Sequence, residues 1–229
     1  MAIKQELSER VATILRERWN VRDGNKVPEA QDLSLGNDAV KLDGVVLYAD
    51  LDASTDLVDR FRPEFAAEVY KSFLHCSARI IKDESGEVTA YDGDRVMAIF
   101  IGSDSCDRAA RSALKINNAR IEVINPALKR QYPDTTYQLS HVVGLDKCNL
   151  FVARTGVRGA NDLVWVGKAA NHAAKLCILP DYQTWITAEV FNELSAACRT
   201  GADGTSMWEQ RHWTNMNRIV YRSNWMWQC

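Results

Sequence analysis

The stretch VVLYADLDAST, residues 45–55, places an apolar run directly before two acidic residues that stand two positions apart. A short apolar run that ends in a polar turn is typical of a strand inside a sheet. A second stretch, AYDGDRVMAIFIG at residues 90–102, has two acids at a sharp turn ahead of another apolar run. We therefore predict two buried strands with Asp50 and Asp94 at their ends.

The composition of the chain limits the class of protein. It has 229 residues, of which 46% are hydrophobic and 25% charged, and a formal net charge of −2. This balance gives no electrostatic reason to bind nucleic acid or an anionic membrane. The apolar runs are too short to span a bilayer, and the N-terminus is too charged for a signal peptide. Six widely spaced cysteines without a CxxC pair predict free thiols in a reducing cytoplasm.

Two domains are predicted: an N-terminal helix and linker over residues 1–43, and a folded domain over residues 44–229. The helix is predicted because apolar residues recur at every fourth position, which gives one apolar face. Such a helix must cover either its own domain or a second subunit. The segment after it is polar and rich in glycine, so it is interpreted as a linker. The apolar positions are Ile3, Leu7, Val11, Leu15 and Trp19.

Within residues 44–229, short strands alternate with helices. The order βαββαβ with appended αβ units predicts an α+β fold, in which helices cover a mostly antiparallel sheet. The predicted elements are a strand before Asp50, a short helix capped by Ser54 or Thr55, a helix from Pro63, a hairpin of residues 87–91 and 95–101, a helix over 103–125 closed by Pro126 and Pro133, a hairpin of 137–146 and 149–153, strand–helix pairs from 162 and 185, and two closing strands in the tryptophan-rich C-terminal segment.

Asp50 and Asp94 are candidate metal ligands. If their strands are neighbours, the two carboxylates meet at one edge of the sheet, and a positive charge must offset their repulsion. Mg²⁺ and Mn²⁺ prefer oxygen ligands, and a pair of such ions can hold the attacking and leaving oxygens of a phosphoryl transfer. The alternative is that Asp50 and Asp94 are helix caps or solvated turn acids. Asp52 and Asp92 are interpreted as turn residues.

Four segments in the right order resemble class III nucleotide cyclases. YADLDASTDLV (48–58) and GEVTAYDGDRVMAIF (86–100) are similar to the two metal-binding segments of that family. VWVGKAANHAAKL (164–176) is similar to a third family segment. HVVGLDKCNLFVARTGVRG (141–159) occupies the place of the hairpin that precedes this third segment in the family. The resemblance covers about residues 44 to 179. It implies a ferredoxin-like catalytic domain that acts as a head-to-tail homodimer with composite active sites.

The resemblance also implies a role for individual residues. Asp50 and Asp94 would bind two Mn²⁺ or Mg²⁺ ions per site, and the main-chain carbonyl of Leu51 would complete one coordination sphere. The second subunit would supply Asn171, which orients the ribose, and Lys175, which contacts the α-phosphate in place of the usual arginine. Phosphate contacts are further implied for the main-chain N–H groups of Asp52, Ala53, Ser54 and Thr55, and for the side chain of Arg218.

The positions that choose the base in purine cyclases depart from the family pattern. The lysine or glutamate expected four residues before the second metal aspartate is Ala90, next to Tyr91, and the aspartate or threonine of the third segment is Val164. Neither Ala90 nor Val164 can hydrogen-bond to a purine. The expected glycine after the first metal segment is Ala53, and a family histidine has become Asp146.

The amino-acid sequences of the two metal-binding segments are most similar to those of the uridylate and cytidylate cyclases of bacterial anti-phage (Pycsar) signalling. This likeness implies conversion of UTP to cyclic UMP, which a separate effector reads. A pyrimidine is smaller than a purine, and a reshaped pocket with Tyr48, Tyr91 or Arg95 nearby would favour it. Three alternatives stay open: a cytidylate cyclase, an adenylate cyclase with atypical base recognition, and a catalytically silent nucleotide-binding module.

Overall fold

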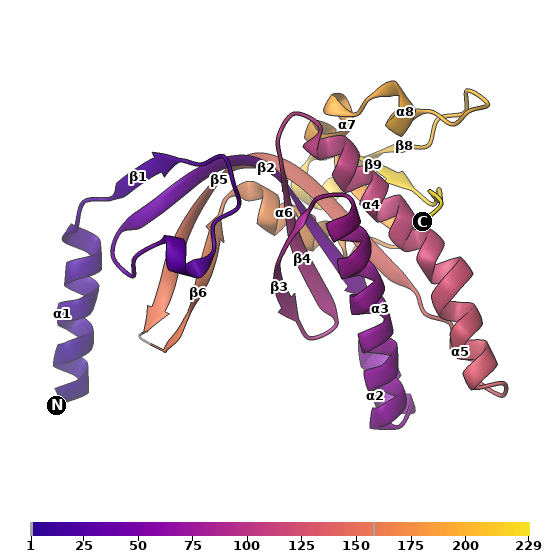
Figure 1. Cartoon of the computed structure of the whole chain (residues 1–229), viewed down its shortest axis with the longest axis horizontal. Helices are drawn as coiled ribbons and strands as arrows, with labels where there is room; N and C mark the ends of the chain where they lie inside the picture. The colour runs from indigo at the N-terminus through magenta and orange to yellow at the C-terminus, as the bar shows by residue number, and fades with distance from the viewer. Residues whose placement is uncertain (1, 158) are drawn as a thin grey trace. The chain divides into compact units, whose positions relative to one another are not determined.

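The computed structural model describes residues 2–157 and 159–229 (Figure 1). These residues divide into two compact units. The first unit combines residues 1–43 with residues 149–167, and the second combines residues 44–148 with residues 168–229. The sequence predicts residues 149–167 as part of the larger domain, whereas in the structure they cluster with the N-terminal segment. Strands β2 (Asp38–Leu51) and β5 (His141–Val157) each contribute residues to both units.

The first unit contains more regular structure than a helix and a linker. Strand β1 pairs in parallel with the first part of β2, and the last part of β5 forms an antiparallel hairpin with β6. The linker prediction was therefore wrong for β1 and for the start of β2. Polar side chains of these two strands pair with each other: Arg22 of β1 forms an ion pair of 2.8 Å with Asp38 of β2. The elements beside β2 and β5 are α1 (Ala2–Arg16), β1 (Asn20–Asp23), η1 (Ala30–Asp32) and β6 (Ala160–Val166).

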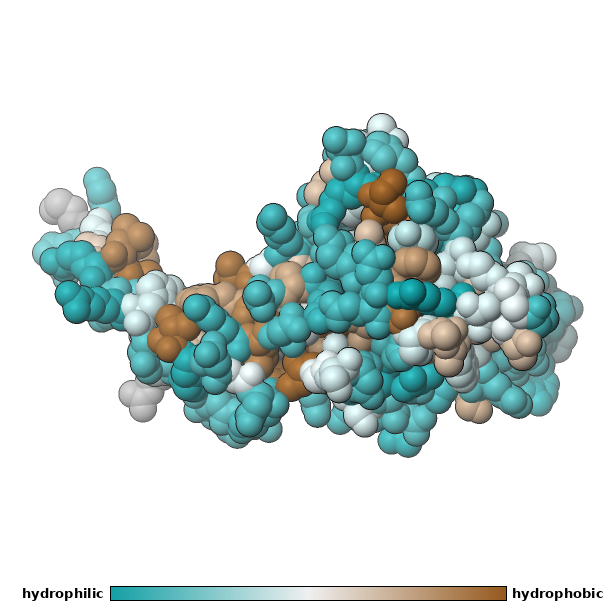
Figure 2. Space-filling model, turned by 90° about the horizontal axis from the view of Figure 1, so that it is seen from above, coloured by the Kyte–Doolittle hydropathy of each residue, from teal (hydrophilic) through white to brown (hydrophobic). Residues whose placement is uncertain are grey.

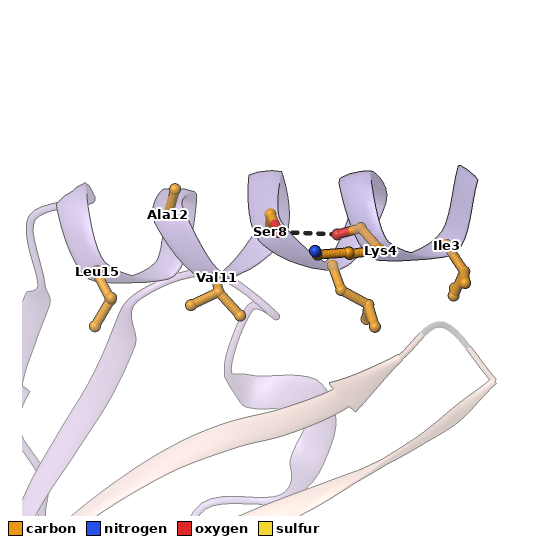
Figure 3. Close-up of a pocket in the computed structure, with 7 residues that line it drawn as sticks. Ile3, Lys4, Ser8, Val11, Ala12 and Leu15 are labelled. Atoms are coloured by element: carbon orange, nitrogen blue, oxygen red, sulfur yellow. Dashed lines mark hydrogen bonds between the residues drawn. The ribbon is translucent and has the colours of Figure 1, made fainter. Parts of the chain in front are cut away.

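Helix α1 has the predicted apolar face, but none of its side chains is buried. Figure 3 shows Ile3, Val11 and Leu15 extending from the same side of the helix, and apolar atoms are visible over this helix at the left of Figure 2. Ile3 is 63% exposed and Leu15 is 80% exposed. Trp19, which follows the helix, packs edge-to-face against Phe151 at a ring separation of 5.0 Å.

The second unit is built on a sheet with the strand order β3-β4-β2-β5-β7-β9-β8. Its first four strands have the ferredoxin-like order, and the pairings β2–β4, β3–β4, β7–β9 and β8–β9 are antiparallel, whereas β5–β7 is parallel. The predicted α+β class is confirmed. The further elements are α2 (Ser54–Arg60), α3 (Pro63–Asp83), β3 (Glu87–Asp92), β4 (Arg95–Ile101), α4 (Ser105–Ala119), η2 (Arg120–Ile124), α5 (Asn125–Gln131), α6 (Lys168–Leu176), β7 (Thr184–Thr187), α7 (Ala188–Glu193), α8 (Ala196–Arg199), β8 (Glu209–Trp213), η3 (Thr214–Met216) and β9 (Arg218–Ser223).

The two faces of this sheet are covered by different helices. Side chains alternate between the faces of a strand, so Val143 and Leu145 of β5 enter the large core with residues of α3 and α4. Gly144, between them, faces α6 instead. A Cβ atom on Gly144 would lie 2.1 Å from the carbonyl oxygen of Ala173. Only glycine therefore allows α6 to lie this close to β5.

The second predicted hairpin, of residues 137–146 and 149–153, was wrong. These residues belong to the single long strand β5, and the turn lies further on, between Val157 and Ala160. The polar run that begins at Asp146 resembled a turn in the sequence. In the structure, however, Asp146 is buried and hydrogen-bonded to other elements, so the strand continues through it.

The helix predicted over residues 103–125 extends further along the chain than predicted, to Gln131. Pro126 does not close it, because η2 is a π-helical segment that leads directly into α5, and Pro126 lies in the first turn of α5. Proline has no N–H to donate and interrupts the helical hydrogen-bond pattern, and this interruption falls directly after the π-helical segment. The hairpin of β3 and β4, the strand–helix pairs and the two closing strands are confirmed.

Two predictions from composition can be compared with the structure. All six cysteines are free thiols.

Two of the C-terminal tryptophans, Trp208 and Trp213, are buried, while Trp225 and Trp227 are partly buried against the large core. Packing therefore accounts for the tryptophan-rich segment. In the residues that the structure describes, no helix is long and apolar enough to cross a membrane.

Candidate active site

The two candidate metal ligands lie at one edge of the sheet of the second unit. Strand β2 pairs with β4 from Gly44 opposite Ile101 to Asp50 opposite Arg95. Asp94 immediately precedes Arg95 in the turn that joins β3 to β4. The antiparallel register therefore brings Asp50 and Asp94 together, as the positions of the acids in the sequence predict.

The carboxylate of Asp50 is held in a partly buried, charged setting. Its side chain is 15% exposed, and Nη2 of Arg95 donates a hydrogen bond of 2.7 Å to its Oδ2. Burial raises the pKa of Asp50, Arg95 opposes that shift, and the charge of Asp94 adds to it. The single guanidinium therefore does not neutralise both carboxylates, and a further positive charge would stabilise the pair.

These residues fit a hard divalent cation. Two carboxylates and a main-chain carbonyl are oxygen donors of the type that Mg²⁺ and Mn²⁺ prefer. Among the described residues, no group of three or more histidine, cysteine, aspartate or glutamate side chains is placed to hold a metal. Asp50, Asp94 and the carbonyl of Leu51 would therefore hold the ions together with non-protein oxygens, which suits ions that bind along with a phosphorylated substrate.

The segment that follows the first aspartate is only partly free for phosphate. The N–H of Asp52 donates to the carbonyl oxygen of Ser140 at 3.0 Å, so it is already used. Ala53 adopts a left-handed conformation (φ 54°, ψ 36°) and caps helix α2, which begins at Ser54. The predicted side-chain cap from Ser54 or Thr55 was therefore wrong. The N–H groups of residues 53–55 remain candidates for phosphate contacts.

The third segment forms helix α6, which divides into a buried and an exposed face. Asn171 and Lys175 are exposed and lie one turn apart on the same face, as their spacing predicts. Within the described part of the chain, no hydrogen bond or ion pair engages either side chain. His172 lies between them in sequence but is buried with Ala169, Ala173 and Leu176. It therefore lies on the opposite face of the helix from Asn171 and Lys175.

Arg218, the predicted triphosphate-binding cation, is engaged within its own subunit. Its Nη2 forms an ion pair with Oε1 of Glu189, and its Nη1 lies 2.9 Å from Nδ1 of His172. Its side chain is 29% exposed. The sequence gives no sign of these partners, because they lie 29 and 46 positions away along the chain.

The base-selecting positions fall in different parts of the chain. Ala90 and Tyr91 are on β3, just after an irregularity at Thr89 that shifts the register of β3 against β4. Tyr91 is 58% exposed. Val164 lies on β6 in the first unit, where it pairs with Ala153 and is 39% exposed. All three side chains therefore have surface that a ligand or another chain could cover.

Two features were missed by the sequence analysis. One is the ion pair between Arg95 and Asp50, which the hairpin register could have indicated because Arg95 directly follows the turn. The guanidinium also lies 5.7 Å from the ring centroid of Tyr48, whose phenol pKa is raised by burial. The other is the buried contact between Asp146 and His172, which the sequence around either residue does not predict.

The fold and the placement of these residues can be compared with solved proteins. A bacterial light-regulated adenylyl cyclase matches 80% of this chain and 52% of its own at a TM-score of 0.67 and 22% identity. A guanylyl cyclase matches 82% of this chain and 94% of its own at a TM-score of 0.68 and 16% identity. The chain therefore has the fold of the class III nucleotide cyclase catalytic domain.

Full-length relatives define the family within that class. A uridylate cyclase of Xanthomonas perforans is 50% identical over 100% of this chain and 99% of its own length. A uridylate cyclase of Burkholderia cepacia is 45% identical over 99% of both chains. No protein-family model matches the sequence. The chain belongs to the uridylate cyclase family, and it is a nucleotide cyclase.

Proposed function

We propose that the protein converts UTP to 3′,5′-cyclic UMP and pyrophosphate. The observation that carries this proposal is the register of β2 against β4, which pairs Asp50 with Arg95, the neighbour of Asp94, so that the charge of Asp94 is close enough to raise the pKa of Asp50. The names of the full-length relatives support the choice of UTP.

Two Mg²⁺ or Mn²⁺ ions, when bound, would lower the pKa of the ribose 3′-OH and neutralise charge on the triphosphate. Asp50 and Asp94 would hold them, and the carbonyl of Leu51 would add a donor. The N–H groups of residues 53–55 face the phosphates at the start of α2. Because the protein takes no part in covalent chemistry, these residues act by positioning and by electrostatics.

Asn171 and Lys175 complete the site from the second subunit of a homodimer. Asn171 orients the ribose so that its 3′-oxygen faces the α-phosphorus, and Lys175 places a positive charge on the α-phosphate. Both side chains are exposed in the single chain, which suits residues that act across an interface. Lysine is a compact point charge, so it contacts the phosphate without the two-pronged geometry of arginine.

The exposed apolar surface of the first unit supports the homodimer. The sequence left two roles for the apolar face of α1, and the first of them, covering its own domain, is not what the structure shows, since α1 buries no side chain. Most of the large apolar side chains that are exposed in the described chain lie in this unit, although it is the smaller of the two. They are Ile3, Leu7, Val11, Ile14, Leu15, Trp19, Val21, Val157, Val164 and Val166.

A pyrimidine base suits the residues at the selecting positions. Ala90 and Val164 offer no group that recognises the polar edge of a purine. Tyr48 is half-buried under the guanidinium of Arg95, close to the metal edge, and both can hydrogen-bond to a smaller base. A cytidylate cyclase and an adenylate cyclase with atypical base recognition are the enzymatic alternatives. We further propose that the product acts in the bacterial cytoplasm, where a separate effector reads it during anti-phage defence.

The test is to incubate the purified protein with UTP, CTP, ATP or GTP in the presence of Mn²⁺ and to separate the products by chromatography. We expect cyclic UMP from the wild type and none from Asp50→Ala. Cyclic AMP as the main product would keep the mechanism and overturn the base assignment. Nucleotide binding without release of pyrophosphate would indicate a silent binding module.

A further inference from the structure

A buried network of polar residues lies beneath helix α6. Asp146 of β5 is 2% exposed, and its Oδ1 accepts hydrogen bonds of 2.5 Å from Oγ1 of Thr187 and 2.8 Å from the N–H of Lys147. Its Oδ2 lies 2.7 Å from Nδ1 of His172, which is itself 7% exposed. Each carboxylate oxygen of Asp146 therefore has a partner inside the subunit.

The chemistry of the contact fixes which group donates. An ionised carboxylate only accepts hydrogen bonds, so Nδ1 of His172 carries the hydrogen and donates it to Asp146. The guanidinium of Arg218 packs against the same edge of the imidazole, with Nη1 2.9 Å from Nδ1. Because both nitrogens carry hydrogen, this is a packing contact and not a hydrogen bond, and Arg218 is held by its ion pair with Glu189. Trp213 packs edge-to-face on the imidazole, with ring centroids 6.2 Å apart. These contacts join α6 to β5, α7, β8 and β9.

His172 is the one polar residue among those that α6 buries. The other buried residues are Ala169, Ala173 and Leu176, of which Ala173 and Leu176 lie against Gly144 and set how close the helix lies to the sheet. Two alanines and a leucine have no directional contacts, so they leave the rotation of a nine-residue helix about its axis weakly defined. A buried, charge-assisted hydrogen bond is directional and strong. It therefore fixes which residues of α6 face outward.

We propose that Asp146, His172 and Arg218 are positioning residues for catalysis: they fix the rotation of α6, so that Asn171 and Lys175 meet the substrate of the partner's half-site. This inference rests on the proposed function. It also gives Arg218 a role inside its own subunit in place of contact with the triphosphate.

The kinetic test uses Asp146→Asn, which keeps the shape of the side chain but removes its charge. A small misplacement of groups that act in the transition state lowers kcat and leaves ground-state binding nearly unchanged. We expect kcat for cyclic UMP formation to fall about 10-fold or more, with KM for UTP within about twofold. Arg218→Gln, at a more exposed side chain, should lower kcat in the same way.

A second measurement separates positioning from loss of stability. In a Lys175→Ala, Asn171→Ala background, Asp146→Asn should have little further effect on kcat, because the groups that it positions are gone. Glu84→Gln is the matched control: Glu84 is also a buried acid, with ion pairs of 2.8 Å to Arg111 and 2.9 Å to Lys115, away from α6. It should lower the midpoint of thermal unfolding without lowering kcat.

The outcomes are distinguishable. Full kcat in Asp146→Asn, or an equal further loss in the Lys175→Ala, Asn171→Ala background, overturns the positioning role. A rise in KM for UTP with unchanged kcat in Arg218→Gln shows instead that Arg218 binds the triphosphate. If the wild type cyclises no nucleotide, or if Asn171→Ala keeps full activity, the proposed function itself fails.

Discussion

Two clusters of charged residues in the second unit use the same side-chain types in opposite ways. At the sheet edge, Arg95 satisfies one oxygen of Asp50, while Asp94 lies half-buried in a turn with no ion pair in the described chain. Under α6, both oxygens of Asp146 have partners within the subunit. The first cluster is open and the second is closed.

The difference shows where to expect chemistry. Burial raises the pKa of Asp50 although a guanidinium contacts it, so the single guanidinium does not offset the cost of burying this carboxylate. A cation and a substrate phosphate would complete the open cluster. The closed cluster needs no ligand, and its effect on catalysis is indirect, through the helix that it fixes.

The largest expected effect concerns what completes the open cluster. Asp50 and Asn171 both belong to the second unit, yet we propose that one active site takes them from different subunits. Asp50→Ala and Asn171→Ala should each be nearly inactive alone. After mixing in equal amounts with subunit exchange, roughly a quarter of the wild-type activity should return, because half of the dimers are mixed and each has one intact site.

The measurement is the rate of cyclic UMP formation before and after mixing, with subunit exchange verified by two differently tagged chains. Mixing Asp50→Ala with Asp94→Ala is the control, since both changes fall on the same half-site and no intact site can form. If exchanged Asp50→Ala and Asn171→Ala chains stay inactive, the active site is not shared between subunits.

The open cluster could be predicted from the sequence, and the closed one could not. Asp50 and Asp94 each follow or precede a strand with a strong apolar pattern, and a tight hairpin fixes their register, so local signals place them. Asp146 gave the opposite signal. A polar run in the middle of β5 resembled a turn, because its partners Thr187 and His172 lie 41 and 26 positions away.

Helix α1 shows a further limit of sequence patterns. Its periodicity correctly predicted an apolar face over residues that are helical in the structure. Periodicity in the sequence shows that one face of a helix is apolar, but it does not identify the surface that covers this face. The base-selecting positions are similar: Ala90 and Val164 show what the pocket lacks, whereas the contacts of Arg95 with Asp50 and Tyr48 depend on how the strands pair.

The two buried histidines differ in their hydrogen-bond partners. His172 has partners, whereas neither ring nitrogen of His141 has a hydrogen-bond partner among the protein atoms that the structure describes. Burial lowers the pKa of His141 from 6.5 to about 3. As the pH falls below 6.5 the unfolded chain takes up a proton that the folded chain refuses, so stability is lost between pH 6.5 and pH 3. For one such group the loss is about 2 kcal/mol by pH 5.

His141→Phe removes this proton uptake and keeps an aromatic ring beside Phe73, which lies 5.7 Å from the imidazole. Urea unfolding at pH 7.5 and pH 5 should therefore show a smaller drop in the free energy of unfolding for His141→Phe than for the wild type. The exposed His75, replaced in His75→Gln, is the control and should keep the wild-type drop. Equal drops in the wild type and His141→Phe would show that His141 is protonated without unfolding.

The smallest expected effect is at Ala53, where the open cluster meets α2. An alanine with φ 54° is strained by about 1 kcal/mol, because its Cβ crowds the following carbonyl in the left-handed region. Ala53→Gly should relieve this strain, although the greater freedom of glycine in the unfolded chain offsets part of it. We expect a gain of up to about 0.5–1 kcal/mol in the free energy of unfolding, measured with urea. Ser85, with φ 56° at the end of α3, is a matched position away from the site. If Ser85→Gly stabilises the protein and Ala53→Gly does not, the left-handed turn at Ala53 is supported by contacts that only the alanine methyl group makes.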